Sequence, residues 1–161
     1  MAKLFLDDIR KPFDVKQAWH KGAWEEFPSL FSWTIVRSYD QFVQFILQNG
    51  LPSVISFDHD LSWEHYPKSE LSLTAPINYA AFKEKTGLDC AKWLIEYCLV
   101  NQFELPDFYV HSFNPVGRAN IINLLSRFKE FQNAEDASIS NSENPKIIVP
   151  GSPDWPMESS K

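Results

Sequence analysis

Three aspartates in this chain directly follow short apolar segments. Asp7 and Asp8 come after Lys3–Leu6, and Asp58 comes after Val54–Phe57. Carboxylates that lie close together repel one another, and they are tolerated where a cation or protons neutralise them. Their oxygens are hard ligands of the kind that Mg²⁺ uses in sites that also accept a phosphate. The three aspartates therefore predict a Mg²⁺ site.

Two imidazoles adjoin the same segment ends. His59 directly follows Asp58, and His111 directly precedes Ser112. Opening a cyclic phosphodiester requires a base that activates water and an acid that protonates the leaving oxygen, and histidine titrates nearest neutral pH. We therefore predict that His59, His111 and Asp58 are catalytic. A single histidine is more often structural, so the hypothesis depends on both imidazoles.

Other side chains near these positions favour a phosphate ligand. Guanidinium groups bind phosphate oxygens bidentately, and a helix that starts at an Asn-Pro step presents free N–H groups to an anion. A serine hydroxyl adds a donor, and a glycine removes a side chain from the approach. The predicted ligand-binding residues are Arg10, Arg37, Ser112, Asn114 and Gly117.

The elements that must position these residues alternate between strands and helices. Apolar runs predict buried strands at Lys3–Leu6, Trp33–Val36, Val54–Phe57 and 108–110, and helical patterns follow the second, third and fourth runs. A short or distorted helix is expected around 15–26. This alternation is typical of an α/β fold with a doubly wound parallel sheet, in which ligands bind outside the carboxyl ends of the strands. All four segment ends should therefore face one pocket.

Two long segments depart from this regularity. Residues 61–85 separate the third strand from its helix, which is longer than a structureless loop usually is, so we expect a lid over the carboxyl edge. After Phe131 the chain turns polar and loses its periodicity. We therefore place one domain at 1–131 and a flexible tail at 132–161, in which 146–149 is a possible fifth edge strand.

Composition excludes several classes of protein. The chain of 161 residues has a net charge of −6, which argues against sequence-independent binding to duplex DNA. No apolar stretch is long enough to span a membrane, and acidic residues follow Met1 too soon for a secretory signal, so a cytoplasmic location is expected. Cys90 and Cys98 lie eight positions apart in a predicted helix, roughly 12 Å, and are too distant for a disulfide. We expect both thiols in the core.

Four motifs together resemble the cyclic-phosphate processing receiver-like family, which is related to the receiver domains of response regulators. The motifs are Phe5-Leu-Asp-Asp-Ile-Arg-Lys-Pro12, Phe57-Asp-His-Asp-Leu61, Gly87-Leu-Asp-Cys-Ala-Lys-Trp93 and His111-Ser-Phe-Asn-Pro-Val-Gly117. The resemblance covers about residues 3–130. It implies a flavodoxin-like fold and action on cyclic phosphate ends, and it agrees with the strand order 2-1-3-4 that sequential crossovers favour.

The sequence leaves more than one function open. The first hypothesis is a phosphoesterase that acts on a cyclic or terminal phosphate of a nucleotide or RNA end. The second is a receiver-like module that binds a phosphate ligand, or accepts a phosphoryl group on Asp58, without turnover. Signalling receivers carry a lysine after the fifth strand, whereas the candidate fifth strand here runs into Pro150-Gly-Ser152. The absence of this lysine weakens the hypothesis that Asp58 accepts a phosphoryl group.

A haloacid-dehalogenase-like phosphatase needs an Asp-x-Asp motif on the first strand, but here that spacing occurs at Asp58-His-Asp60 on the third. A purely structural interaction protein is the remaining alternative.

Overall fold

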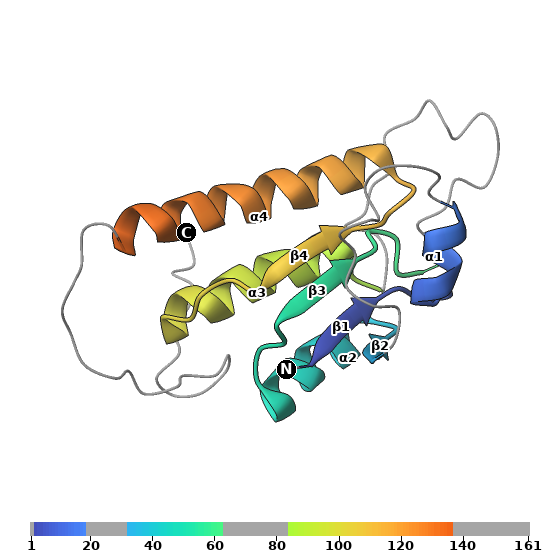
Figure 1. Cartoon of the computed structure of the whole chain (residues 1–161), viewed down its shortest axis with the longest axis horizontal. Coiled ribbons are helices and arrows are strands. Elements are labelled where there is room, and N and C mark those ends of the chain that lie inside the picture. The colour runs from blue at the N-terminus through green and yellow to red at the C-terminus, as the bar shows by residue number, and fades with distance from the viewer. Residues whose placement is uncertain (1, 19–31, 63–83, 137–161) are drawn as a thin grey trace.

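In the part of the chain that the structure describes, four strands form one parallel sheet. The computed structural model describes residues 2–18, 32–62 and 84–136. Within these ranges the strands pair in the order β2-β1-β3-β4, as Figure 1 shows. Their bounds are β1 Lys3–Leu6, β2 Trp33–Val36, β3 Val54–Phe57 and β4 Asp107–Val110. The predicted α/β class and the order 2-1-3-4 are confirmed.

Within the described ranges, capping side chains mark where three of the helices begin. The helices are α1 Pro12–Ala18, α2 Tyr39–Asn49, α3 Gly87–Asn101 and α4 Pro115–Asp136. The Ser38 side chain caps α2 by accepting from the Gln41 N–H, and Thr86 and Asp89 form a capping box at α3. Asn114 accepts the Gly117 N–H through Oδ1 at the start of α4.

Two helix bounds differ from the sequence prediction. Helix α1 begins at Pro12 rather than near Val15, because proline suits the first helical position and the Asp14 carboxylate accepts the Lys11 N–H. Helix α4 continues to Asp136, so the predicted domain boundary at 131 falls inside it. Gln132 holds this last part, since its side chain accepts from the Leu105 N–H and donates to the Phe103 carbonyl. The predicted tail beyond 136, its edge strand at 146–149 and most of the predicted lid lie outside the described residues.

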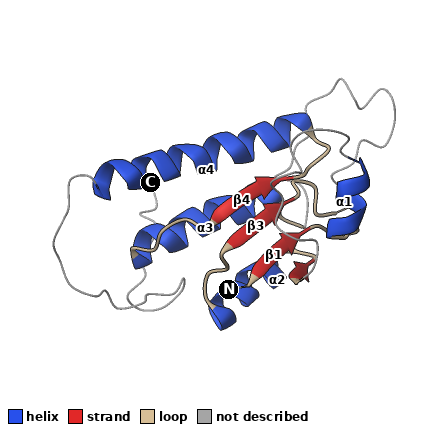
Figure 2. Ribbon diagram, viewed as in Figure 1, coloured by secondary structure: helices blue, strands red, loops and turns tan. Residues whose placement is uncertain are grey.

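Alternation along the strands divides the sheet into two faces. Leu4 and Leu6 of β1 and Ile55 and Phe57 of β3 belong to one apolar cluster with side chains from α2, α3 and α4. Figure 2 shows α2 and α3 behind the sheet and α1 at the end toward which the strands point. Cys90 and Cys98 are free and buried in this cluster, as predicted. The residues between these apolar positions, Phe5 and Ser56 among them, point to the other face.

The strand register lines up the residues that follow the strands. Leu6 pairs with Val36 and with Phe57, and Phe57 pairs with Val110. The ladder continues by one residue, because the N–H groups of Asp7, Asp58 and His111 donate to Val36, Leu6 and Phe57. Arg37, Asp7, Asp58 and His111 therefore form one row across the carboxyl edge, on the face of Phe5 and Ser56. None of the helices within the described ranges is long and apolar enough to cross a membrane.

Gly87 fixes how closely α3 approaches the end of β3. A Cβ at this position would lie 1.8 Å from the Asp58 carbonyl oxygen, while the Gly87 N–H donates to the His59 carbonyl at 2.8 Å. Any side chain would push the main chain of Asp58 away from the row. The close contact at Gly87 thus positions both the first turn of α3 and the main chain of Asp58.

We expect Gly87→Ala to lower stability by about 1 to 3 kcal/mol and to displace Asp58, because the added methyl overlaps backbone that cannot rotate away. Thermal melts and ¹H–¹⁵N spectra of the Asp58 and His59 amides measure the two effects. The control is Gly50→Ala: Gly50 has a φ of 79° and no atom within 4 Å of an added Cβ, so its cost is backbone strain alone. Unchanged Asp58 and His59 resonances in Gly87→Ala would contradict the expectation.

Candidate functional site

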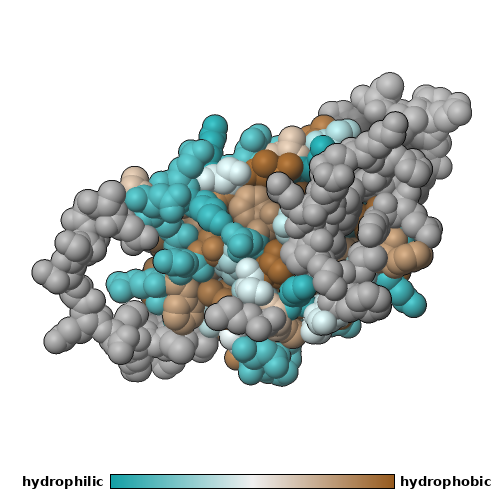
Figure 3. Space-filling view, in the orientation of Figure 1, coloured by the Kyte–Doolittle hydropathy of each residue, from teal (hydrophilic) through white to brown (hydrophobic). Residues whose placement is uncertain are grey.

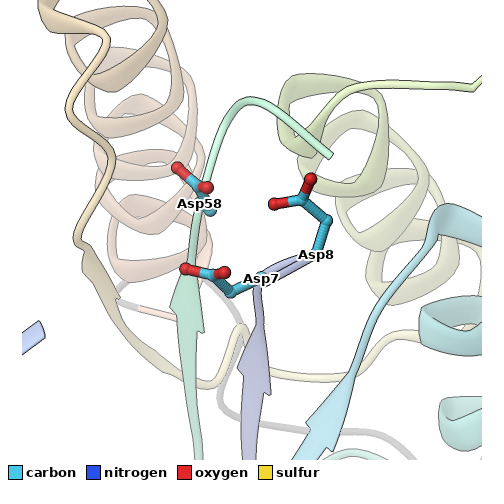
Figure 4. A group of neighbouring side chains, drawn as sticks. All are labelled: Asp7, Asp8 and Asp58. Atoms are coloured by element: carbon cyan, nitrogen blue, oxygen red, sulfur yellow. The ribbon is translucent and has the colours of Figure 1, made fainter. Parts of the chain in front are cut away.

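Three carboxylates converge at the carboxyl edge of the sheet. Asp7 and Asp8 come from the end of β1 and Asp58 from the end of β3, and one oxygen of each lies within 4.8 Å of the others. Figure 4 shows these side chains turned toward one another above the strand ends. The sequence predicted this convergence from the positions of the strands, and the register explains it.

Asp7 is fully buried and accepts four hydrogen bonds. Its Oδ1 accepts from the backbone N–H groups of Ile9 and Arg10. Its Oδ2 accepts from Arg10 Nε at 2.7 Å and from His111 Nε2 at 3.1 Å. Burial raises the pKa of Asp7, but the hydrogen bond from His111 and the charge of Arg10 outweigh it, so the net pKa is lowered. Asp7 is therefore an ionised carboxylate inside the protein.

Arg10 joins two of the three aspartates. Its Nη2 lies 2.8 Å from Asp58 Oδ2 while its Nε holds Asp7. The other Asp58 oxygen accepts the His59 N–H at 2.8 Å. Burial raises the pKa of Asp58, and the positive charge of Arg10 offsets part of that rise. One guanidinium thus neutralises one of the two charges it contacts.

Asp8 adds a third carboxylate to the cluster. Burial, together with the nearby charges of Asp7 and Asp58, raises its pKa to about 6. In the described part of the chain, no group hydrogen-bonds its buried Oδ1. Counted as formal charges, three carboxylates against one guanidinium leave two negative charges. The three sets of carboxylate oxygens and the net negative charge of the cluster fit a hard divalent cation such as Mg²⁺.

His111 lies beneath the cluster, in the sheet. It is 1% exposed, its ring stacks on Phe5 with centroids 4.3 Å apart, and its Nδ1 lies 2.7 Å from Ser56 Oγ. Burial lowers its pKa further than the neighbouring carboxylates raise it, so the ring is neutral near pH 7. Because Asp7 only accepts, Nε2 carries the proton and Nδ1 accepts from Ser56. Both nitrogens are occupied, which favours holding Asp7 over transferring protons to a substrate.

His59 points to different neighbours from those of His111. Its Nδ1 lies 2.8 Å from Asp60 Oδ1, and the ring is buried. It lines a cavity of about 280 Å³ between the first turns of α3 and α4, together with Thr86, Lys92 and Gly117. The described contacts therefore place the two imidazoles in separate surroundings, not as a facing pair.

Besides Arg10, the four predicted phosphate-binding residues each have a different place in the structure. The Ser112 side chain hydrogen-bonds Asp58 and accepts the Asn114 N–H, so it lies at the cluster. Asn114 caps α4. A Cβ on Gly117 would lie 2.3 Å from the His59 ring, so the space it leaves is filled by the imidazole. Arg37 donates through Nη1 to the carbonyls of Asp7 and Arg10, at 2.7 and 2.6 Å, and clamps the loop after β1.

The family comparison agrees with this geometry. The family model for the cyclic-phosphate processing receiver domain matches residues 2–127 of the chain. The chain belongs to this family. Searches of the curated proteins and of the solved structures found no match. The four motifs named in the sequence analysis lie inside the matched range, whereas the predicted tail at 132–161 lies outside it.

Sequence reasoning missed three residues that build this receiver-like site. Ser56 orients His111, Asp60 orients His59, and Gly87 admits α3 against Asp58. Ser56 is the one polar residue in the otherwise apolar strand β3. A polar side chain in a buried strand needs a hydrogen-bond partner, and this was the signal in the sequence for a partner such as His111. The Asp60 signal was its place in the Asp-His-Asp motif.

We expect Asp8→Asn to raise the melting temperature at pH 7 in the presence of EDTA. The pKa of Asp8 rises from 3.8 to about 6 on folding, so the folded state holds the extra proton and stability falls as pH rises from about 4 to about 6. The gain in the variant should shrink as the pH falls toward 4 and disappear below about pH 3, where Asp8 is protonated in both states. Asp40→Asn on α2 is the control for loss of one charge. A variant less stable than the wild type at pH 7 would contradict the expectation.

Proposed function

We propose that the protein is a phosphoesterase that acts on a cyclic or terminal phosphate of a nucleotide or RNA end, with Mg²⁺ as its cation. The observation that carries the proposal is the cluster of Asp7, Asp8 and Asp58 at the carboxyl edge, in a chain whose family processes cyclic phosphates. Open parallel sheets bind ligands at this edge. The partner is accordingly a phosphate-bearing small molecule or an RNA end.

The three aspartates hold the cation in this proposal. Asp8 supplies an oxygen without a hydrogen-bond partner among the described residues, and Asp7 and Asp58 supply the remaining charge. When bound, a divalent cation stabilises the negative charge that develops on the phosphate oxygens. Gly87 and the Arg37 clamp keep the carboxylates in register for it.

The loop between β4 and α4 binds the phosphate. The Ser112 hydroxyl lies beside Asp58, and the first turn of α4 presents the positive end of the helix dipole to this loop. Asn114 uses its own side chain to cap Gly117, so the contribution of Asn114 is to hold this turn in place.

Hydrolysis forms a bond between phosphorus and a water oxygen and breaks the bond to the leaving oxygen. The water loses a proton and the leaving oxygen gains one. We assign the proton transfer to His59, because the Asp60 carboxylate orients its ring as a base requires, and because His59 lines a cavity. His111 acts on Asp7 as a positioning residue, and Asp58 binds the cation.

The alternative is a module that binds a phosphate ligand without turnover. One observation favours it: both nitrogens of His111 are occupied and the ring is neutral and buried, so one of the two expected proton carriers faces no ligand. The two functions differ in a single measurable property, the release of product.

We expect purified protein to hydrolyse at least one 2′,3′-cyclic or terminal phosphate when Mg²⁺ is present, with product followed by ³¹P NMR. Asp58→Asn should lower both the rate and the dependence on Mg²⁺, because an amide cannot supply the charge of the carboxylate. Asp40→Asn, with the same change in charge on α2, should behave as the wild type. Binding without turnover under every divalent cation would decide for the alternative.

The two histidines should differ in what they change. His59→Gln is expected to lower the turnover rate by roughly 10² to 10⁴ and to leave Mg²⁺ binding unchanged, as for loss of a positioned proton carrier. His111→Gln should weaken Mg²⁺ binding as well, because Asp7 loses its orienting donor. Rate–pH profiles and Mg²⁺ titrations separate the roles. Full activity in His59→Gln would remove His59 from the mechanism.

A further inference from the structure

Arg10 lies among the aspartates at the place where a cation has to bind. Its guanidinium contacts Asp7 Oδ2 at 2.7 Å and Asp58 Oδ2 at 2.8 Å. We infer that a divalent cation displaces the Arg10 guanidinium from Asp7 and Asp58, and that the released guanidinium then binds the phosphate of the substrate. The inference rests on the proposed function and adds to it the residue that couples the cation to the phosphate.

The first step follows from the hydrogen bonds of Asp7. A carboxylate has about four lone-pair positions. All are used, since Oδ1 accepts two backbone N–H groups and Oδ2 accepts Arg10 Nε and His111 Nε2. A cation that coordinates Asp7 needs one of these positions, so one donor has to leave.

Only one of the four donors is free to move. The backbone N–H groups belong to a loop whose carbonyls at Asp7 and Arg10 are held by Arg37. His111 is 1% exposed and is fixed between the Phe5 ring and Ser56. The Arg10 side chain is 18% exposed and is attached through a flexible stem. Rotation of this side chain releases Asp7 and Asp58 while the backbone stays in place.

An exposed aromatic ring lies beside the guanidinium and can keep contact with it after release. With Arg10 still bound to the aspartates, its Cζ already lies 4.6 Å from the centroid of the Phe113 ring, which is 62% exposed in the loop that also carries Ser112. Figure 3 shows apolar atoms at the surface over the first turns of α4, next to this loop. Within the described residues, no group hydrogen-bonds the buried Arg10 Nη1. Two edges of a planar guanidinium held over Phe113 can bind a phosphate bidentately.

The charges favour the exchange. Counted as formal charges with Arg10 in place, the three carboxylates and the guanidinium leave two negative charges. A divalent cation in place of the guanidinium leaves one. The guanidinium then meets a phosphate whose charge it can balance, so the site accepts the phosphate after the cation.

The test compares Arg10→Gln with a matched control, Lys11→Gln, which removes one positive charge from the adjacent, exposed residue. Calorimetric titration with Mg²⁺ alone should give a dissociation constant lower by on the order of tenfold in Arg10→Gln, because the competitor is gone. With Mg²⁺ saturating, inorganic phosphate should bind about tenfold more weakly to the same variant. Lys11→Gln should stay within about twofold of the wild type in both, as a screened surface charge does.

The opposite signs of these two changes distinguish displacement from general damage. Circular dichroism checks folding, and Arg10→Lys, which keeps the charge but not the planar fork, should lie between the wild type and Arg10→Gln in both titrations. Equal or weaker Mg²⁺ binding in a folded Arg10→Gln variant overturns the displacement. Unchanged phosphate binding overturns the second step. Failure of Mg²⁺ to bind the wild type and both Arg10 variants instead overturns the metal site of the proposed function.

Discussion

The buried carboxylate of Asp7 is the interaction around which the edge of the sheet is arranged. A charge with no exposed surface costs several kcal/mol unless donors replace its water. Its four donors come from the loop after β1 and from His111, which lies 104 positions away in sequence. The β1–α1 loop, the Arg37 clamp and the stacking of His111 on Phe5 all serve to satisfy this one group. Loss of any one of the four donors leaves a buried charged oxygen with one hydrogen bond fewer.

The neighbouring aspartates show that the same edge is not optimised for stability. Asp58 is 1% exposed, and Asp8 is held beside two like charges that raise its pKa to about 6. A fold selected for stability alone would place apolar or paired groups there. Perturbed carboxylates of this kind are typical of functional sites, and they agree with a family that handles phosphate.

The two histidines illustrate how adjacent motifs diverge in three dimensions. His111 belongs to the row formed by Asp7 and Asp58, whereas His59 comes one position later than that row and packs against Gly117 and Asp60. Alternation of side chains along a strand separates residues that are one position out of register. The imidazoles therefore have different roles in the proposed mechanism, one orienting a carboxylate and one transferring protons.

Much of this protein was determined by its sequence alone. The four apolar runs, the helical patterns that follow three of them and the aspartates that end β1 and β3 predicted the α/β fold, the strand order and the acidic cluster, because periodicity is a local property and crossover rules then limit the order of the strands. Only the tertiary structure decided which donors reach each carboxylate. The Ser56–His111–Asp7 chain, the bridge of Arg10 between Asp7 and Asp58, and the contact of Gly87 with Asp58 join residues from different elements. Such contacts depend on register and on side-chain direction, which no local pattern encodes.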